Sequence, residues 1–334
     1  MRRESATARC DIAVLVDEEV GNRNRSGRFV VDRGTMENYV LQVLRERGTV
    51  SVVPFVAQIT PTVDELRALK PRLVFNLTEW LGGDRRLDAA IAGVLEMMKL
   101  PYTGSGPDGM HLARDKALAK DIVAKLGIPV ARHVVVNGRR QPAASLTYPV
   151  IVKPQFGDAS EGMSSAALVA SASELKARLA AVRRRIREPL LCEEFIEGRD
   201  LFVGLLGNEP RVMSAVELVV GRRGPRAPRF ATSSVKNDAP YRSRWRVRWQ
   251  PAKLPDAVVR MIEDTSRRVF HALKLRDYAR IDYRLTTDHR LFFLEANPNP
   301  DLGPHSFGRD RCLSGLPYGE LISGIVSAAL ARPR

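Results

Sequence analysis

Several features that would place this 334-residue chain in a specialised class are missing from it. Its three cysteines, Cys10, Cys192 and Cys312, have neither the even number of a disulfide framework nor the spacing of a zinc site, which predicts a reduced, cytoplasmic setting. No membrane-spanning helix is expected, because the chain lacks the long apolar run that one needs. The N-terminal MRRESATARC carries charge without a following apolar segment, so no secretory signal is predicted. Internal repeats and long low-complexity tracts are also absent from the sequence.

The chain is long enough for two or three domains with a well-buried core. Its hydrophobic content of 44% and its mixed charges are typical of an ordinary globular protein. The formal net charge is +15. Such a balance suits a nucleic acid, an anionic membrane or an acidic small molecule as partner. It is also expected if the genome is biased toward arginine codons. Charge alone leaves these alternatives open.

The stretch DYARIDYRLTTDHRLFFLEANPNPDLGPHS near the C-terminus is predicted to form two strands joined by a tight turn at residues 287–288. That turn would place Ile281 opposite Leu294 and Tyr283 opposite Phe292. Side chains alternate across a strand, so one face would be apolar, comprising Ile281, Tyr283, Leu285, Phe292, Leu294 and Ala296. The other face would collect four polar groups: Arg280, Asp282, Glu295 and, just past the strand, Asn297.

Two carboxylates, an amide oxygen and a guanidinium on one face suit a magnesium–polyphosphate site. Mg²⁺ takes oxygen ligands from one or two carboxylates and leaves its other positions to phosphates and water. An arginine beside it can hold anionic oxygens that form during a reaction. The alternative is a solvated strand face with a surface ion pair. The Asn-Pro-Asn-Pro run after the glutamate favours the site, because it forces an irregular backbone where a substrate loop would begin.

The first part of the chain alternates strands with helices. Strands are predicted at residues 11–16, 50–56 and 73–75, and helices at 35–47 and 87–98. This alternation is typical of a parallel sheet, so the predicted fold class is α/β, with an α+β arrangement in the C-terminal part.

Two stretches in the middle of the chain place lysines where phosphate could bind. Residues 110–126 are predicted as one helix with Lys116 and Lys120 one turn apart on one side, although such lysines are usually solvated. In YPVIVKPQFGDASEGM, Lys153 ends an apolar strand and a loop of small residues follows at 157–162. Such a loop lets backbone N–H groups approach phosphate oxygens, whereas a glycine-rich turn alone is most often only a hairpin.

The motif LLCEEFIEGRD is predicted to be a strand, a turn and the start of a second strand. Glu193 and Glu194 interrupt its apolar pattern, which a solvated acidic hairpin would not explain. Further on, residues 221–250 are rich in arginine, proline and glycine, with Trp245 and Trp249 among the arginines. That composition is typical of single-strand nucleic-acid sites, but we favour a mobile active-site lid over a polyphosphate.

Four motifs, taken in their order along the chain, resemble those of the ATP-grasp ligases, in particular the D-alanine–D-alanine ligase branch. They are Asp115-Lys116, the hairpin at residues 153–162, EEFIEGRD at 193–200, and ARIDY with LEANPNPDLGPHS at 279–306. The resemblance covers roughly residues 73–330. It implies an ATP-dependent carboxylate–amine ligase that joins two amino acids through an acyl phosphate and releases ADP and phosphate.

The resemblance also implies roles for individual residues. It assigns ATP and its phosphates to Lys116, Lys153, the hairpin residues Ser160 and Gly162, and the lid residue Lys236. It assigns the adenine to Glu193, Glu194, Phe195 and Ile196, and the ribose to Asp200. It assigns two Mg²⁺ ions, or Mn²⁺ in their place, to Asp282, Glu295 and Asn297. It assigns the reacting oxyanion to Arg280, catalytic assistance to Lys153 and Ser306, and the second amino acid to Arg280, His305 and Ser306.

The implied architecture is an ATP-grasp fold behind an N-terminal Rossmann-like, or pre-ATP-grasp, parallel-sheet domain. The expected boundaries are residues 1–105 with a flexible tail at 1–10, 106–189 for the central part, and 190–334 for the C-terminal part with its lid at 221–250. A homodimer is expected by analogy with the family.

Two departures from the family keep alternatives open. The stretch VDEEVGNRNRSGRFV replaces a loop rich in glycine and serine, so that Glu18, Glu19 or a neighbour would receive the first substrate's amine. Ala159 stands where the D-alanine branch often has a serine. One alternative is therefore a ligase for another substrate pair in specialised peptide or amide biosynthesis. The other is a non-catalytic protein that binds nucleotides or nucleic acid.

Overall fold

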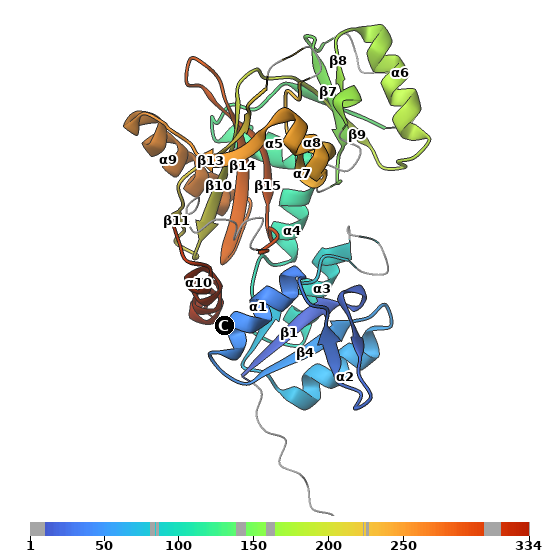
Figure 1. The fold of residues 1–334 in the computed structure, drawn as a ribbon, viewed down its shortest axis with the longest axis vertical. Coiled ribbons are helices and arrows are strands. Elements are labelled where there is room, and N and C mark those ends of the chain that lie inside the picture. Colours follow the sequence, from blue (N-terminus) through green and yellow to red (C-terminus); the bar gives the residue numbers. More distant parts are fainter. Residues whose placement is uncertain are drawn as a thin grey trace, which may run out of the picture.

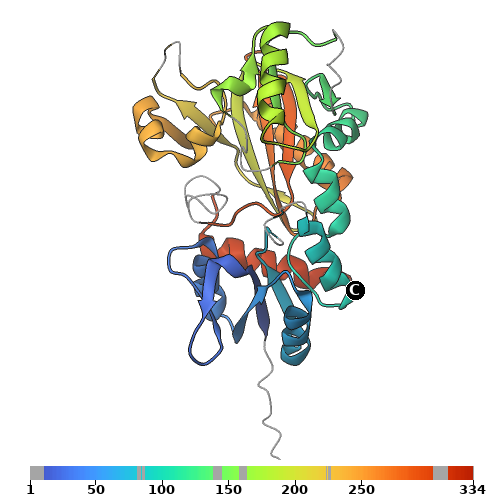
Figure 2. The same ribbon diagram turned by 90° about the vertical axis from the view of Figure 1, so that its right-hand side faces the viewer.

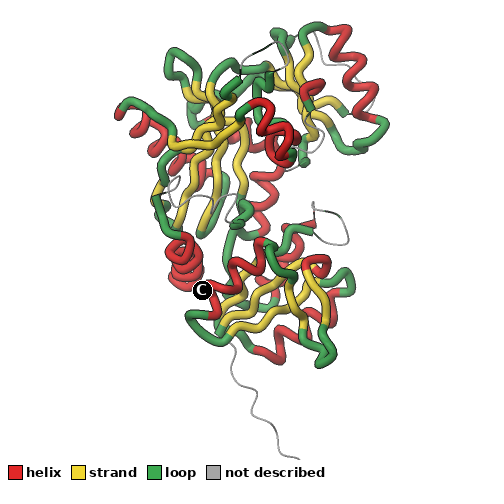
Figure 3. The backbone as a smooth tube through the Cα atoms, in the orientation of Figure 1, coloured by secondary structure: helices red, strands yellow, loops and turns green. Residues whose placement is uncertain are grey.

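The structure is a computed structural model that describes residues 11–80, 84, 87–137, 145–157, 164–222, 224, 227–303 and 315–333. Three main sheets follow one another along the long axis of the molecule (Figure 1). The N-terminal sheet lies at one end, a six-stranded sheet lies in the middle, and a four-stranded sheet lies at the other end (Figure 3). Among the residues described, no helix is long and apolar enough to cross a membrane.

The N-terminal sheet is parallel, which confirms the prediction from the alternating pattern. Its central strand β1 (Ile12–Asp17) lies between β4 (Val50–Phe55) and β5 (Leu73–Asn76). Every residue of β1 is buried, as expected for a parallel strand that is covered on both faces. The carboxyl ends of these strands face the rest of the molecule.

Helices α1 (Met36–Arg45) and α3 (Asp88–Met97) form where they were predicted. The Thr35 hydroxyl caps α1 by accepting a hydrogen bond from the N–H of Asn38 at 3.2 Å. Helix α2 (Ile59–Leu69) was not predicted. Between β1 and α1 the chain forms a 3₁₀ turn η1 (Glu18–Val20) and a hairpin of β2 (Gly21–Arg23) and β3 (Phe29–Val31).

The single helix predicted at residues 110–126 is wrong, because the chain breaks there into α4 (Pro107–Arg114) and α5 (Lys116–Lys125). Asp115 at the break has an extended backbone, with φ −77° and ψ 94°. Its carboxylate accepts hydrogen bonds from the N–H groups of Ala117 and Leu118, both at 3.1 Å. An aspartate competes well for the first N–H groups of a helix, so it starts a new helix here.

The four-stranded sheet is antiparallel in the order β6-β9-β7-β8. Its strands are β6 (His133–Val136), β7 (Val150–Pro154), β8 (Leu168–Val169) and β9 (Leu190–Glu194). Helix α6 (Ala172–Arg183), capped by Ser171, packs Leu175, Leu179 and Val182 against it.

The six-stranded sheet contains the strands that carry the candidate site. Its main path is β13-β12-β10-β14-β15, and β11 pairs with β10. The strands are β10 (Arg199–Leu206), β11 (Arg211–Val212), β12 (Val216–Val220), β13 (Val247–Pro251), β14 (Tyr278–Leu285) and β15 (Leu291–Asn297). The amphipathic helix α9 (Asp256–Ala272) buries Val258, Ile262 and Val269 in the core behind this sheet.

The predicted register of the β14–β15 hairpin is wrong, although the two strands do pair as predicted. Ile281 lies opposite Ala296 and Tyr283 opposite Phe293, with an irregularity between Asp282 and Tyr283. The loop has three residues rather than two, because Thr286 pairs with Arg290 and His289 takes a left-handed conformation with φ 62°. Phe292 and Leu294 are thereby shifted out of the predicted apolar set, and Leu294 instead lines a cleft.

The described part of the segment 221–250 is folded rather than a plain loop. It contains α7 (Ser233–Asn237), α8 (Ala239–Trp245) and most of β13, and it projects to one side of the six-stranded sheet (Figure 2). The side chain of Trp245 is only 7% exposed. A buried indole is not available for stacking on nucleic-acid bases, whereas Trp249 is partly exposed, so one of the two tryptophans no longer supports the nucleic-acid interpretation.

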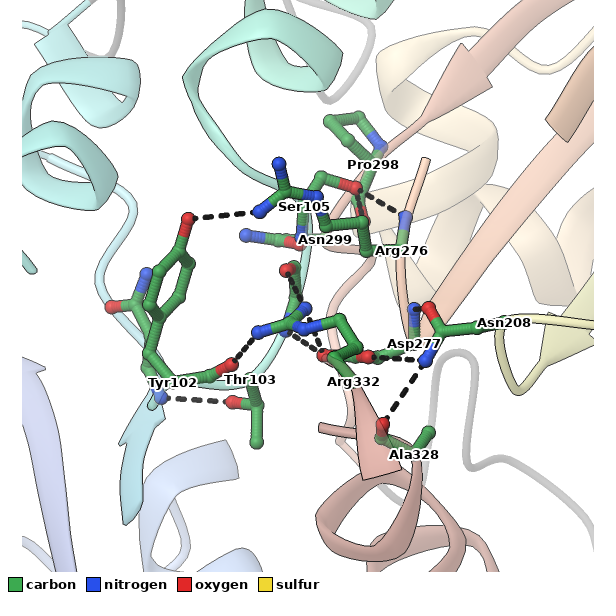
Figure 4. A network of polar contacts seen from close by, with 12 residues as sticks. Tyr102, Thr103, Ser105, Asn208, Arg276, Asp277, Pro298, Asn299, Ala328 and Arg332 are labelled. Carbon is green, nitrogen blue, oxygen red and sulfur yellow. Dashed lines mark hydrogen bonds and ion pairs between the residues drawn. The ribbon is translucent and has the colours of Figure 1, made fainter. Parts of the chain in front are cut away.

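The last helix, α10 (Tyr318–Ala331), packs its Leu321, Ile322 and Ile325 into the same apolar cluster as β1 and α1. Just after it, Arg332 bonds the carbonyl of Gly104 at 3.1 Å and the carboxylate of Asp277 at 2.8 Å (Figure 4). Asp277 also accepts a hydrogen bond from the N–H of Gly104 at 2.8 Å. The segment around Gly104, which connects the N-terminal sheet to the rest of the chain, is thus held by hydrogen bonds to residues that adjoin β14 and α10.

Candidate active site

A cleft that is open to solvent and encloses about 870 Å³ brings together side chains from the four-stranded sheet, the six-stranded sheet and the segment 221–250. Ten of the residues predicted from the sequence line it: Lys116, Lys153, Glu193, Glu194, Phe195, Ile196, Asp200, Lys236, Asp282 and Glu295. A smaller hollow of about 300 Å³ shares Lys116, Gly157 and Glu295 with the cleft and reaches Asn297.

The two acidic strand residues share one face, as the alternating pattern predicted, and they lie directly opposite each other, which the predicted register did not give. Asp282 pairs with Glu295, and Arg280 pairs with Asn297, in the β14–β15 register. The Arg280 guanidinium donates two hydrogen bonds to Asp282, one to each carboxylate oxygen, at 2.7 and 3.0 Å. Burial raises the pKa of Asp282, Arg280 counteracts this, and Glu295 raises it further. These four side chains form a polar face, of which Asp282 and Glu295 line the cleft and Asn297 lines the smaller hollow beside it.

Lys116 lies beside these carboxylates because α5 starts at that point. Its Nζ is 3.9 Å from Glu295 Oε2 and donates to the carbonyl of Gly157. Gln155 fixes the start of the helix by donating from its side chain to Asp115 at 2.7 Å. The end of β7 and the start of α5 are therefore held together next to the polar face.

A buried glutamate flanked by two lysines lies in the wall of the cleft. Glu193 forms ion pairs with Lys153 at 2.7 Å and with Lys120 at 3.0 Å. Burial would raise the pKa of Glu193, but the two lysines lower it to about 2. Burial lowers the pKa of Lys120 to about 8 in spite of Glu193. For Lys153 the burial effect is outweighed by Glu193 and Glu295, which raise its pKa.

The opposite end of the cleft is largely apolar. The Phe195 ring meets the Phe230 ring edge to face, with 6.0 Å between centroids, and Ile196 also lines this end. Asp200 lies nearby and forms an ion pair with Arg284. An apolar pocket next to a carboxylate suits a base and its ribose, which are the roles predicted for these residues.

Lys236 reaches the cleft from α7. The Thr232 hydroxyl starts this helix by accepting a hydrogen bond from the N–H of Val235 at 3.2 Å, and Val235 is fully buried. The carbonyl of Lys236 accepts a hydrogen bond from Arg242 at 2.8 Å. Four other predicted site residues, Ser160, Gly162, His305 and Ser306, lie outside the described residues.

Sequence reasoning missed three residues of this site. Lys120 was expected to be solvated, although its position one turn after Lys116 already put it on the same side of the helix. Arg284 was not singled out, although alternation along β14 puts it on the face of Arg280 and Asp282. For Phe230, inside the arginine-rich segment, no sequence signal was available.

The region expected to receive the first substrate's amine lies at the carboxyl end of β1. Glu18 and Glu19 are exposed there, whereas Asp17 is buried and accepts hydrogen bonds from the N–H groups of Glu79 at 3.0 Å and Trp80 at 3.3 Å. Burial raises the pKa of Asp17 to about 6, the two backbone bonds lower it, and Glu19 and Glu37 raise it.

This pKa gives a prediction on stability. Because the folded pKa lies above the ordinary value of 3.8, the ionised form of Asp17 costs stability, and that cost grows as the pH rises from 3.8 through 6. We expect the change in the free energy of unfolding on Asp17→Asn to be about 1–2 kcal/mol more favourable at pH 8 than at pH 4, while at both pH values the amide keeps only one of the two backbone hydrogen bonds. Urea unfolding at both pH values measures this, with the exposed Asp64→Asn as control. An effect of the substitution that is equal at the two pH values would contradict the prediction.

The charges of the cleft suit a polyphosphate that is bound together with a cation. Among the described residues, no group of three or more His, Cys, Asp or Glu side chains could hold a metal ion. Asp282, Glu295 and Asn297 do offer oxygen atoms on one face, which is the number and type of protein ligand that Mg²⁺ uses when phosphates and water complete its shell. The residues therefore fit a phosphate-bound Mg²⁺.

The fold and the cleft define an ATP-grasp protein. A crystal structure of D-alanine–D-alanine ligase from Bacillus anthracis complexed with ATP superposes with a TM-score of 0.70 over 96% of this chain and 97% of that one, at 17% sequence identity. Residues 122–327 match the family model for the D-ala D-ala ligase C-terminus. The chain belongs to the D-alanine–D-alanine ligase family.

Two relatives extend the match beyond the C-terminal part. A D-alanine–D-alanine ligase of Gluconobacter oxydans is 32% identical over 297 residues, which cover 87% of this chain and 92% of that protein. An uncharacterised protein of Sinorhizobium fredii, y4sG, is 32% identical over 262 residues, which cover 78% of this chain and 75% of its own. The fold class and the family inferred from the four motifs are thus confirmed.

Proposed function

We propose that this chain is an ATP-dependent D-alanine–D-alanine ligase that forms a peptide bond and releases ADP and phosphate. One observation carries the proposal: a single cleft joins three lysines, an apolar base pocket and a facing pair of carboxylates. The similarity to the Gluconobacter oxydans ligase over most of both chains supports D-alanine as the substrate. A different substrate pair and a non-catalytic role are alternatives that the experiment below distinguishes.

In the proposed complex, ATP lies along the cleft. Its adenine occupies the apolar end between Phe195, Ile196 and Phe230, and its phosphates lie toward Lys116 and Lys153. Lys236 approaches from the segment 221–250, so closure of that segment would add a third positive charge and exclude water. Mg²⁺ held by Asp282, Glu295 and Asn297 would neutralise charge on the phosphates.

The reaction has two steps in this proposal. A carboxylate oxygen of the first D-alanine attacks the γ-phosphorus, so that an acyl phosphate forms and the bond to ADP breaks. The amine of the second D-alanine then attacks the acyl carbon, loses a proton, and expels phosphate. In this proposal Arg280, on the face of Asp282, stabilises the developing oxyanion, and the lysines hold the phosphates in line for transfer.

The test is ATP-dependent phosphate release across single and paired D- and L-amino acids, with Mg²⁺ present and mass spectrometry of the products. We expect release with D-alanine alone and a product with the mass of its dipeptide. Release only with another pair would replace the substrate and keep the ligase chemistry. Silence across the panel, with ATP still bound, would contradict the proposed enzyme and favour a non-catalytic nucleotide-binding role.

Other features stay predictions that this function supports. We propose the boundaries 1–105, 106–189 and 190–334 for the three domains, with a lid at 221–250. Dependence on ATP suits a cytoplasmic location, and the family suggests a homodimer. Size-exclusion chromatography with light scattering would determine the oligomeric state.

A further inference from the structure

Arg284 connects three separate segments at the base end of the cleft. Its side chain is almost fully buried, and its Nε donates to the carbonyl of Ile196 at 2.8 Å. One terminal nitrogen pairs with the carboxylate of Asp200, and the other donates to the carbonyl of Arg229 at 2.8 Å. These partners belong to the turn after β9, to β10, and to the segment 221–250. The guanidinium thus directs a hydrogen bond to each of the three.

The pairing of Arg284 with Asp200 is built into the sheet. The two residues lie directly opposite each other in the antiparallel β10–β14 register. Directly opposed residues present their side chains to the same face, so the ion pair needs no loop to bring it together. Only arginine can serve all three partners, because its planar group has five N–H donors in a fixed fork, whereas a lysine has a single ammonium.

The base pocket is assembled around the same guanidinium. The Arg284 Cζ lies 4.8 Å from the centroid of the Phe195 ring, and the Arg229 Cζ lies 4.9 Å from it. Arg229 also pairs with Glu197 in the turn between β9 and β10. An aromatic ring held by two arginines and by Phe230 has a fixed orientation, which is what an adenine-stacking wall needs.

The bond from Arg284 to the carbonyl of Arg229 also lies at the start of the segment that carries Lys236. The next residue, Phe230, packs with Ile151 of β7. Thr232 then caps α7, whose last turn carries Lys236 into the cleft. A displacement of Arg284 would therefore be transmitted through six residues to a lysine at the phosphate end.

We propose that Arg284 is a positioning residue that couples recognition of the ribose by Asp200 to the seating of the segment 221–250 over the phosphates. It holds Asp200 by one carboxylate oxygen and leaves the other to accept from ribose hydroxyls. It holds the segment 221–250 through a hydrogen bond to the carbonyl of Arg229. A bound nucleoside triphosphate stabilises both contacts at once. This inference rests on the proposed nucleotide-binding function.

Two substitutions separate the two halves of the coupling. Arg284→Met removes all three hydrogen bonds, whereas Arg284→Lys keeps a positive charge for Asp200 and cannot also bond the carbonyls of Ile196 and Arg229. Arg199→Met is the matched control, because Arg199 is a neighbouring β10 arginine that pairs with Glu217 and does not line the cleft.

The readouts need no turnover. Calorimetry measures the affinities for ATP and for 2′,3′-dideoxy-ATP, and limited trypsin digestion measures protection of the arginine-rich segment with and without ATP. We expect wild type and Arg199→Met to prefer ATP and to be protected by it. In Arg284→Met, ATP affinity should fall about tenfold or more, the preference for ATP should disappear, and protection should be lost. Arg284→Lys should keep the preference and lose the protection.

Several outcomes would overturn the inference. One is an Arg284→Met protein with wild-type preference and protection. Another is a uniform loss of affinity for both nucleotides with protection retained, which would mean that Arg284 only supports the fold. If Arg284→Met does not fold, Arg284→Lys decides: wild-type values for both readouts overturn the coupling. Amino-acid-dependent ADP release is measured separately, so a protein that binds ATP without turnover would contradict the proposed function alone.

Discussion

Glu295→Gln is expected to lower amino-acid-dependent ADP release by about a thousandfold at saturating ATP and Mg²⁺. Glutamine keeps the shape of the side chain and removes the charge that faces Asp282 across the strand pair and that lies 3.9 Å from Lys116. The proposed Mg²⁺ would lose one of its two carboxylate ligands, and Lys116 would lose its nearby counter-charge. The main effect should fall on kcat, because these charges act most strongly where the phosphoryl group transfers.

A coupled ADP assay over a range of Mg²⁺ concentrations measures this effect. Excess Mg²⁺ should restore only a small part of the rate. Glu263→Gln is the control, because Glu263 is a partly exposed residue of α9 whose ion pair, among the described residues, is with Arg267 on the same helix. If Glu295→Gln kept full activity, the assignment of this carboxylate to the metal would be wrong, and Asp282 with Asn297 would have to suffice.

Glu193→Gln is expected to destabilise the fold by roughly 3–5 kcal/mol at pH 7. The substitution leaves the ammonium of Lys120, which is fully buried, and that of Lys153 without the carboxylate between them. When one partner of a buried ion pair is removed, the other charge stays buried, and nothing offsets the free energy of its desolvation. Urea unfolding should show a lower midpoint with an unchanged slope.

The pKa of Glu193 predicts how the effect of this substitution on stability changes with pH. Because the pKa of Glu193 is lowered to about 2 from its ordinary 4.5, its stabilising contribution is fully present above about pH 4.5 and is lost as the pH falls toward 2. The gap in stability between wild type and Glu193→Gln should therefore narrow in that window. A second substitution, Lys120→Met, should restore part of the lost stability, since it removes one of the two unpaired charges. A gap that is constant with pH would show that the amide itself, and not the charge, causes the loss.

Alternation along the strands was enough to predict the polar face of the site. Between Arg280 and Asp282 the strand is regular, so both side chains point to the same face. Glu295 and Asn297 are also two residues apart, and they reach that face in any register that is shifted by an even number of residues. The register of the two strands was not predictable in the same way. It depends on His289 in a left-handed conformation, and the loop sequence Thr-Asp-His lacks the glycine that would have indicated it.

Pairings between distant segments limited the rest of the prediction. Helical spacing placed Lys120 beside Lys116, but its burial depends on Glu193 and on the carbonyl of Phe293, which lie far away in the sequence. In the same way, Arg284 takes its role from Asp200 only after β10 and β14 have paired. A local pattern determines which way a side chain points, whereas its partner is determined by tertiary structure.

The place of α10 has a consequence for how the protein is made. The apolar cluster around β1 and α1 is completed by Leu321, Ile322 and Ile325, from the last helix of the chain. While the ribosome is still synthesising the middle of the protein, the first sheet therefore has one uncovered hydrophobic side. Contacts between such distant residues form slowly, and exposed apolar surface invites aggregation and chaperone binding in the meantime. The N-terminal sheet, although it is synthesised before the other two sheets, is thus among the last parts to complete its core.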